Sequence, residues 1–460
     1  MIKKLEINNF KSWQSTGDIH CSKLTGFFGT NSSGKTGLLQ QLLLLKQTTE
    51  SPDRFQVLEF GNEKSYVELG TFNDVIYGHH IREPLGFEIE WSFEKPFQIT
   101  DPSRKKFTLF TGTDLSFSVN IRQTDKGRVY VENLSYIFDN YKFLMKQTKK
   151  EKQEDYDIFV EALPGKEKKF EFKRPPGRPW GLPAPVKFYG FPDQVKAYYQ
   201  NAGFLSDFQL KFEELFKDIY YLGPLRDYPR RQYIWSGAQP GDMGRRGEQV
   251  IDALLFSRER GEKIPRGRGR GKEKVTVEEY VAYWLKELEL INEFRVEQIT
   301  AGSNLYQVKL KISAQGSEVL ITDVGFGVSQ ILPVITLCYY VPPGSTLLIE
   351  QPEIHLHPSV QAGLADVFID AIEKKNIQII LESHSEHLLR RLQRRIAEEK
   401  FAGHLAALYF CERINGESTL KKLELDAFGK IRNWPKGFFG DEMAEMAAMS
   451  EAVMKRKTNA

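Results

Sequence analysis

An eight-residue stretch, GTNSSGKT at Gly29–Thr36, limits the possible folds of this chain more than any other feature. It fits the spacing G-x-x-x-x-G-K-[S/T]. A short apolar stretch at 23–29 leads into it, and a leucine-rich stretch at 36–48 follows it. A strand, a glycine-rich loop and a helix in this order direct backbone N–H groups at an anion. The stretch therefore predicts a phosphate-binding loop in an α/β domain; an ordinary turn before a buried helix is the alternative.

The residues of this loop have defined roles if the anion is a nucleoside triphosphate. Lys35 is expected to reach the β- and γ-phosphates, and Thr36 to bind Mg²⁺. The surroundings of the phosphates are expected to come from Asn31, Ser32, Ser33, Gly34, Lys35 and Thr36. The predicted cofactors are therefore ATP and Mg²⁺.

Length and composition describe a folded protein with little net charge. The chain has 460 residues, of which 32 are Phe and 19 are Tyr, and its formal net charge is +3. Its three cysteines, Cys21, Cys338 and Cys411, are far apart, which argues against a disulfide framework. The longest apolar stretch, 331–341, is too short to cross a bilayer. We expect a cytoplasmic protein without a membrane partner, whose net charge gives no indication of nucleic-acid binding.

The pattern of strands and helices changes along the chain. Strand-like runs separated by turns predict an antiparallel β lobe at 65–145. The stretch 146–275 reads as an insertion that contains a helix near 194–220 and a mobile basic loop. The basic residues of that loop are Arg266, Arg268, Arg270 and Lys272. They either contact phosphate groups or form a solvated loop, as runs of charge usually do. Helices and strands alternate at 328–383, which predicts a parallel α/β sheet.

Two weaker motifs could complete an anion site. The stretch TDVGFGVSQILPV at 322–334 has a glycine-rich turn and Ser329 at the start of an apolar helix, where free N–H groups can bind an anion. A capped helix without a ligand explains it about equally well. The stretch ILESHSEHLL at 380–389 places His384 at the end of a buried strand, where parallel α/β sheets bind ligands. Alone, it is also consistent with a surface histidine.

The stretch LLIEQPEIHLHP at 347–358 carries candidate catalytic residues. Many ATPases end such a strand in Asp-Glu, but here Glu350 is followed by Gln351. Glu350 can hold a magnesium-bound water, whereas the Gln351 amide can orient water but cannot accept its proton. General-base catalysis contributes about 10²–10⁴-fold, so we expect slow hydrolysis unless another carboxylate substitutes. Glu353 and Glu382 are the candidates for that carboxylate.

A transition-metal site is the rival interpretation of the same region. His355, His357, His384 and His387 lie near Glu353 in the sequence, and imidazoles beside a carboxylate can bind zinc or manganese. However, His355 and His357 would point to opposite faces of an extended chain. No ligand set of recognised spacing is complete, so we favour the magnesium interpretation.

The order of these motifs resembles that of a known family. A phosphate-binding loop, a long insertion, a glycine-rich serine turn, an acidic strand and SHS follow each other as in ABC-type ATPases of the SMC, RecF and OLD-like group. The stretches YYLGPLRDYPRR, IEQPEIHLHP and GKIRNWPKGFFGDEMAEM resemble bacterial AAA-family ATPases that end in a DUF3696 domain. The resemblance also implies that a glutamine at 351 is natural, although an exchange introduced to trap ATP would leave the same sequence.

The resemblance implies an ABC-type P-loop ATPase head, of α/β class, with an antiparallel β lobe and a helical, basic insertion. Its parts would be the first half of the head at 1–64, the lobe at 65–145, the insertion at 146–275, the second half of the head at 276–410 and a DUF3696-like segment at 411–460. Two copies would pair head to tail. Each ATP would then lie between the phosphate-binding loop of one copy and Gly325, Gly327 and Ser329 of the other, with His384 at the γ-phosphate. The glutamine that this family usually has between the two motifs has no clear match, and 67–80 occupies its place.

Three functions fit this resemblance. The chain could be an ATP-gated dimer that acts on DNA or licenses an effector. It could instead be the ATPase subunit of an antiphage system that controls a separately encoded nuclease. It could, thirdly, be a nuclease of the OLD type, but too few residues follow His384 to hold a Toprim domain.

Overall fold

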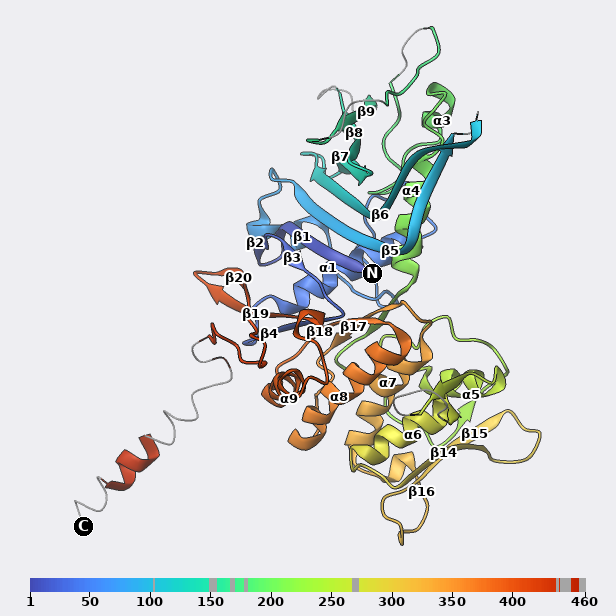
Figure 1. The fold of residues 1–460 in the computed structure, drawn as a ribbon, viewed down its shortest axis with the longest axis vertical. Coiled ribbons are helices and arrows are strands. Elements are labelled where there is room, and N and C mark those ends of the chain that lie inside the picture. Colours follow the sequence, from blue (N-terminus) through green and yellow to red (C-terminus); the bar gives the residue numbers. More distant parts are fainter. Residues whose placement is uncertain are drawn as a thin grey trace.

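The computed structural model describes residues 1–101, 104–148, 155–165, 170–177, 181–266, 273–435, 438 and 448–454. Within these ranges the chain forms a parallel sheet, a large antiparallel lobe and a third region of helices with a small sheet. Figure 1 shows the lobe above the parallel sheet and the helices α5 to α9 below it. The predicted α/β class, with a P-loop sheet joined to an antiparallel lobe, is confirmed.

The parallel sheet is built from segments that are far apart in the sequence. Its strands, in spatial order, are β10 (Ile219–Leu222), β17 (Thr346–Glu350), β18 (Gln378–Glu382), β4 (Leu24–Gly29), β19 (Ala406–Ile414) and β20 (Glu417–Lys422). Neighbouring strands are parallel except for the last pair. β4, β17 and β18 are buried along their whole length, as expected for strands covered on both faces. Their carboxyl ends meet at one edge, which positions the site.

Alternating side chains of the sheet face two separate hydrophobic cores. Leu348 and Ile380 face a core that contains the lobe and the leucines of α1 (Lys35–Glu50). Leu347 and Ile379 face the other core. That second core contains α5 (Val250–Glu259), α6 (Val277–Glu287), α7 (Phe326–Tyr340), α8 (Pro358–Lys375) and α9 (Glu386–Ala397). Most residues of α1 are buried, because the helix lies between the sheet and the lobe.

The antiparallel lobe has wider bounds than the predicted 65–145. Its strands, in spatial order, are β2 (Trp13–Ser15), β1 (Ile2–Phe10), β5 (Leu85–Asp101), β6 (Arg104–Gln123), β7 (Val129–Phe138), β8 (Tyr141–Gln147) and β9 (Tyr156–Ala162), and β3 (Ile19–His20) pairs with β1. Residues 65–84 contain only a short helix, α2 (Phe72–Val75), and the 3₁₀ turn Tyr77–His79. The apolar–polar alternation of residues 2–8 favours a strand there, but it does not reveal the partner of β1, β5, which lies about 80 residues later.

The remaining elements complete the two cores. The helix predicted near 194–220 is two helices, α3 (Gln194–Tyr198) and α4 (Leu205–Lys217); α4 packs its aromatic residues against the lobe. A small sheet contains β11 (Tyr233–Ile234), β15 (Leu305–Lys311), β14 (Glu293–Gln298) and β16 (Val319–Leu320). Strands β12 (Lys263–Pro265) and β13 (Lys274–Thr276) pair around 267–272. Most of the predicted basic loop therefore lies outside the described residues.

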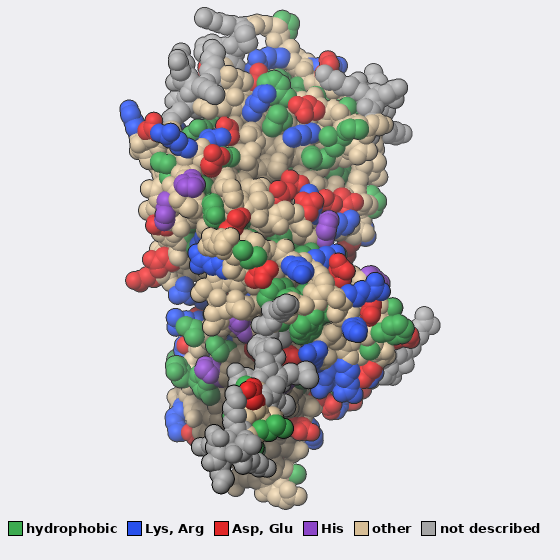
Figure 2. Space-filling model, turned by 90° about the vertical axis from the view of Figure 1, so that its left-hand side faces the viewer, with side chains coloured by type: hydrophobic (Ala, Val, Ile, Leu, Met, Phe, Trp, Pro, Cys, Tyr) green, Lys and Arg blue, Asp and Glu red, His purple; other side chains and the backbone are tan. Residues whose placement is uncertain are grey.

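The surface charge and the character of the helices bear on function. On the face shown in Figure 2, Lys and Arg side chains are interspersed with Asp and Glu side chains. Among the helices of the described ranges, none combines the length and the apolar character that crossing a membrane requires.

Candidate nucleotide-binding site

The loop Gly29–Thr36 connects β4 to α1, and its surroundings require glycine at two positions. Gly29 has φ +144°, and a Cβ there would lie 2.0 Å from the carbonyl oxygen of Cys411. Gly34 has φ +92°, and a Cβ there would lie 2.4 Å from Oγ of Ser418. The indole Nε1 of Trp13 donates to the Gly34 carbonyl at 3.0 Å. Residues of β2, β19 and β20 thus surround the loop and limit its shape.

Lys35 is positioned by the loop that it belongs to. Its side chain is 3% exposed, and Nζ donates to the carbonyls of Gly29 (3.1 Å) and Thr30 (2.7 Å) and to Oγ of Ser33 (3.4 Å). Burial lowers the pKa of Lys35, while the charges of Glu382, Cys411 and Glu353 act in the opposite direction. Gly34 caps α1 without a side-chain hydrogen bond. The helix start therefore keeps N–H groups for an anion, with the ammonium beside them.

Glu382 lies closest to the loop among the acidic residues at this edge. β18 runs between β4 and β17, and Glu382 is paired with Phe27 on one side and with Glu350 on the other. Burial raises the pKa of Glu382, whereas hydrogen bonds from Thr36 and Gln351 and the charge of Lys35 lower it. Its Oε2 is buried and has no hydrogen-bond partner among the described residues. One carboxylate oxygen is therefore left for a ligand of the site.

Glu350 is held by residues on the other side of β17. Its carboxylate accepts a hydrogen bond from the Tyr221 hydroxyl at 3.0 Å, and Nη2 of Arg226 donates to its backbone carbonyl at 3.3 Å. Burial and the charge of Glu382 raise the pKa of Glu350 to about 7, against the effects of Tyr221, Arg226 and Lys11. Two buried acids side by side repel each other, so the site favours a cation between them.

Gln351, Glu353 and His384 form the corner above these strands. Gln351 has a left-handed backbone, with φ +43°, and its N–H donates to the Glu382 carbonyl at 2.9 Å. Oε1 of Glu353 accepts the backbone N–H of His384 at 2.5 Å. Burial and the charge of Lys35 lower the pKa of His384, and the backbone of Gly29 beside the ring partly opposes this effect. These three predicted site residues thus lie beside the loop Gly29–Thr36 and Glu382.

The serine turn forms a second, separate group. Gly325 precedes α7 with open space around it, and the nearest side chain to a Cβ at Gly327 would be Leu356. The hydroxyl of Ser329 donates to the Phe326 carbonyl at 2.7 Å, within its own turn. No recorded hydrogen bond joins this turn to the loop Gly29–Thr36 within the described residues. The turn therefore completes no site with the loop of its own chain.

Sequence reasoning missed several residues of the site. Tyr221 and Arg226 lie in YYLGPLRDYPRR, a stretch that the resemblance singled out without a role. Lys11 was not considered; its N–H donates to the Val75 carbonyl at 2.6 Å, and its Nζ to Oε1 of Gln40 at 2.5 Å. The contact with Val75 places residues 72–80 beside the site. They belong to the segment 67–80, which occupies the place where this family usually has a glutamine.

The rival metal site is not formed. His357 caps α8 by accepting from Ser359, His355 packs against the ring of Phe326 at 5.5 Å, and His384 lies beside the backbone of Gly29. Across the described ranges, no group of three or more His, Cys, Asp and Glu side chains is arranged to hold a metal. A magnesium site differs, because Mg²⁺ takes most of its ligands from phosphates and water.

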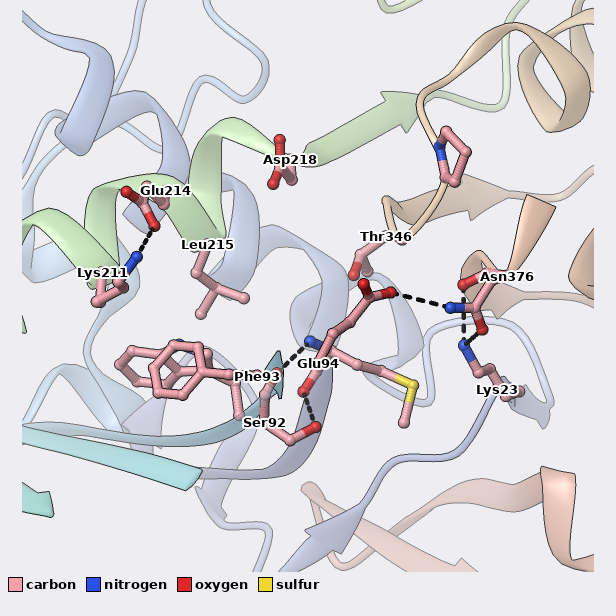
Figure 3. Close-up of a pocket in the computed structure, with 14 residues that line it drawn as sticks. Lys23, Ser92, Phe93, Glu94, Lys211, Glu214, Leu215, Asp218, Thr346 and Asn376 are labelled. Atoms are coloured by element: carbon pink, nitrogen blue, oxygen red, sulfur yellow. Dashed lines mark hydrogen bonds and ion pairs between the residues drawn. The ribbon is translucent and has the colours of Figure 1, made fainter. Parts of the chain in front are cut away.

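A pocket of about 460 Å³ lies at the opposite edge of the sheet (Figure 3). It is lined by residues that precede β4 and start β17, namely Lys23 and Thr346, and by Glu94 and Asn376. The Asn376 amide donates to Glu94 at 3.1 Å, and Lys23 donates to Oδ1 of Asn376 at 2.6 Å. Ligands of parallel α/β sheets bind at the carboxyl ends, so this pocket is not the nucleotide site.

The residues at the carboxyl edge fit a magnesium-bound triphosphate. The uncapped start of α1 and Lys35 suit the phosphates, and Thr36 with the free oxygen of Glu382 suits the cation. The family comparison agrees with this assignment. The family model of the AAA ATPase domain matches residues 1–174 and 273–389, more than half of the chain. The chain belongs to the AAA ATPase domain family.

A second family model covers the end of this AAA ATPase. It is described as a protein of unknown function (DUF3696) and matches residues 405–449. The expected family, a AAA-family ATPase with a C-terminal DUF3696 domain, is therefore confirmed. The match begins just before β19 and includes its hairpin partner β20, so this segment contributes strands to the same sheet as the P-loop. No curated protein matches the AAA ATPase as a whole.

Solved structures of SMC heads show a limited likeness to the AAA ATPase. An SMC head bound to the C-terminal winged-helix domain of ScpA is 11% identical, with a TM-score of 0.46, and the match covers 92% of this chain and 98% of that one. The SMC head domain from Thermotoga maritima is 11% identical, with a TM-score of 0.41 and coverage of 92% and 99%. An SMC head from Pyrococcus furiosus, bound to the C-terminal domain of ScpA, is 10% identical, with a TM-score of 0.39 and coverage of 92% and 96%. The family assignment rests on the two family models.

Proposed function

We propose that this AAA ATPase binds Mg²⁺·ATP on the loop Gly29–Thr36, hydrolyses it slowly, and pairs with a second copy while ATP is bound. The gathering of the loop, Glu350, Glu382 and His384 at one buried edge is the observation that supports nucleotide binding most directly. Lys35 already has three oxygen acceptors in the loop, and phosphate oxygens would replace them.

Calorimetric titration with a non-hydrolysable ATP analogue tests this proposal. Lys35→Ala should abolish measurable binding, because the variant removes the charge that meets the β- and γ-phosphates. Lys64→Ala removes an exposed lysine elsewhere and should bind as the wild type does. Tight binding by the Lys35 variant would contradict the assignment of the loop.

Slow hydrolysis follows from the chemistry of Gln351. No carboxylate follows Glu350 directly, and Glu353 uses one oxygen to accept the His384 N–H. Glu382 lies beside Thr36 and Lys35, where it suits the cation and not the attacking water. Water beside the γ-phosphate would therefore be oriented by an amide and would lack the rate gain of about 10²–10⁴-fold that a positioned base provides.

Pairing is supported by the separation of the two half-sites and by the loop between them. Residues 223–231 contact both half-sites: Arg226 donates to Glu350, and Arg231 donates to Asp323, which precedes the serine turn, at 2.8 Å. Tyr228 in the same loop packs against Phe326 at the start of α7, with ring centroids 5.4 Å apart. Tyr228 is 74% exposed, although it is large and aromatic. A second copy seated on the serine turn would cover it.

We further propose that the paired state acts on an effector protein, such as a nuclease encoded separately in an antiphage system. A protein is favoured over DNA because the basic helix α9 is already neutralised. Arg391 and Arg395 pair with Asp366, and Arg394 pairs with Glu398. The net charge of +3 gives no general attraction to DNA either.

Binding experiments distinguish an effector protein from DNA as the target of the paired state. Purification from the native host in the presence of ATP, followed by mass spectrometry, should recover the effector. Direct DNA action would instead appear as salt-dependent binding of a labelled duplex by the isolated chain. Changing Arg266, Arg268, Arg270 and Lys272 to Ser would then lower the log–log salt slope by about 0.9 for each phosphate contact that is lost.

A further inference from the structure

The position of β18 places a second acid next to the phosphate-binding loop. β18 lies between β4, which carries the loop, and β17, which ends in Glu350. Neighbouring strands are about 4.8 Å apart, so Glu382 is one strand spacing from β4 and Glu350 is two. The carboxylate nearest to the loop is therefore Glu382.

The partners of the two acids also differ. Glu382 is 2% exposed, and its carboxylate lies beside the side chains of Thr36 and Lys35. Its Oε2 is buried and has no partner in the described part of the chain. Glu350, in contrast, accepts from the Tyr221 hydroxyl, on the side of the sheet edge away from the loop. Glu382, the acid on the strand next to the loop, thus has one oxygen without a partner, whereas Oε1 of Glu350 is bonded to Tyr221 on the side away from the loop.

These observations lead to one assignment. We propose that Glu382 is a direct ligand of the nucleotide-bound Mg²⁺, next to Thr36, and that Glu350 is not a direct ligand. The assignment rests on the proposed nucleotide binding at Gly29–Thr36. Mg²⁺ is typically bound by one or two carboxylates together with substrate phosphates and water, and Thr36 with Glu382 provides such a set. A divalent cation on Glu382 also offsets the repulsion between two neighbouring buried carboxylates.

Gln351 has a supporting role in this arrangement. Its side-chain amide is hydrogen-bonded to Glu382, and its backbone N–H donates to the Glu382 carbonyl at 2.9 Å. A glutamate at 351 would place a third negative charge beside Glu382 and Glu350. The neutral amide therefore orients Glu382 without adding to the charge that one Mg²⁺ must balance.

The test measures the effect of Mg²⁺ on nucleotide affinity, not on turnover. The full chain is titrated with AMP-PNP, once in Mg²⁺ and once in EDTA, and the ratio of the two dissociation constants is compared between variants. Glu382→Gln keeps the shape and removes the charge, and Glu350→Gln is the matched control on the neighbouring strand. Glu382→Asp keeps a carboxylate, and melting temperatures confirm that each variant is folded.

The expected result is specific to Glu382. Glu382→Gln should reduce the Mg²⁺ effect at least about tenfold, the lower end for a disturbed metal shell, and should not weaken binding in EDTA, because it removes a negative charge from beside the phosphates. Glu350→Gln should keep most of the effect, and Glu382→Asp should recover part of it. A normal Mg²⁺ effect in Glu382→Gln, or an equal loss in both Gln variants, overturns the assignment. Absence of binding by the wild type in both buffers would instead contradict the proposed function.

Discussion

Glu353 holds His384 in place through a single hydrogen bond, from the His384 backbone N–H to Oε1 of Glu353, at 2.5 Å. The two residues are 31 positions apart, on loops that follow β17 and β18. Glu353 is 7% exposed, so this bond lies in a largely buried environment. The bond fixes the corner that brings the histidine ring to Gly29. The bond gives Glu353 a role in positioning His384, while its Oε2 is buried without a hydrogen-bond partner among the described residues.

The Glu353→Gln variant tests this positioning role. An amide oxygen can still accept the His384 N–H, so single-turnover ATP hydrolysis should stay within about threefold of wild type, far less than the 10²-fold or more lost with a general base. Glu353→Ala should lose much more, because a buried N–H without an acceptor costs about 1–3 kcal/mol and the corner shifts. Abolished turnover in Glu353→Gln would show that Glu353 is the base after all.

The elements around the site could be predicted from the sequence because local patterns define them. The loop Gly29–Thr36 and the strands ending in Glu350 and Glu382 were recognised from apolar runs and flanking motifs. The parallel alternation also implied that their carboxyl ends share an edge. These signals are local, and they were sufficient to predict that the loop, Glu350 and Glu382 lie at the same edge of the sheet.

Other contacts could not be predicted, because they join segments with no shared pattern. Tyr221 reaches Glu350 only because β10 pairs with β17. In this pairing Ile219 lies opposite Thr346, which is 127 residues later in the sequence. The strand order that inserts β18 between β4 and β17 also decides which acid faces the loop, and no periodicity encodes strand order. The observed bounds of the lobe differ from the predicted 65–145 because β1 joins the lobe by pairing with β5, a contact between distant segments.

The Gly34→Ala variant should destabilise the chain. Its Cβ would lie 2.4 Å from Oγ of Ser418 and 2.7 Å from Oγ of Ser12, at φ +92°. Strain at such a backbone position costs about 1–3 kcal/mol, which thermal or denaturant unfolding can detect. Gly37→Ala is the matched control three residues later, where the nearest atom would be 3.4 Å away. It should be neutral or stabilising by up to about 1 kcal/mol, because alanine favours helix. Equal losses in both variants would contradict the account of the loop.

The Ser329→Arg variant should separate nucleotide binding from pairing. The serine turn makes no recorded hydrogen bond to the loop Gly29–Thr36 among the described residues, so a monomer should still bind AMP-PNP with wild-type affinity. Pairing should be lost, because the arginine blocks the start of α7 where the partner's nucleotide would dock. Sedimentation velocity with and without nucleotide measures both states. Thr300→Arg adds the same charge at an exposed turn and should pair normally. If Ser329→Arg still pairs, residues 323–330 are only the start of a helix.

The Gln351→Glu variant addresses the missing base. A carboxylate at 351 would stand beside the attacking water, and single-turnover hydrolysis in saturating Mg²⁺ should rise, by up to about 10²-fold, the lower end for a positioned base. The same carboxylate would lie beside Glu382 and Glu350, so without Mg²⁺ the variant should bind AMP-PNP more weakly than wild type and unfold at a lower temperature. Gln351→Ala is the control, because it removes the amide without adding charge, and it should slow hydrolysis. Turnover of Gln351→Glu that is no faster than wild type would mean that the amide is needed to hold Glu382, and that a neutral residue at 351 is part of the mechanism.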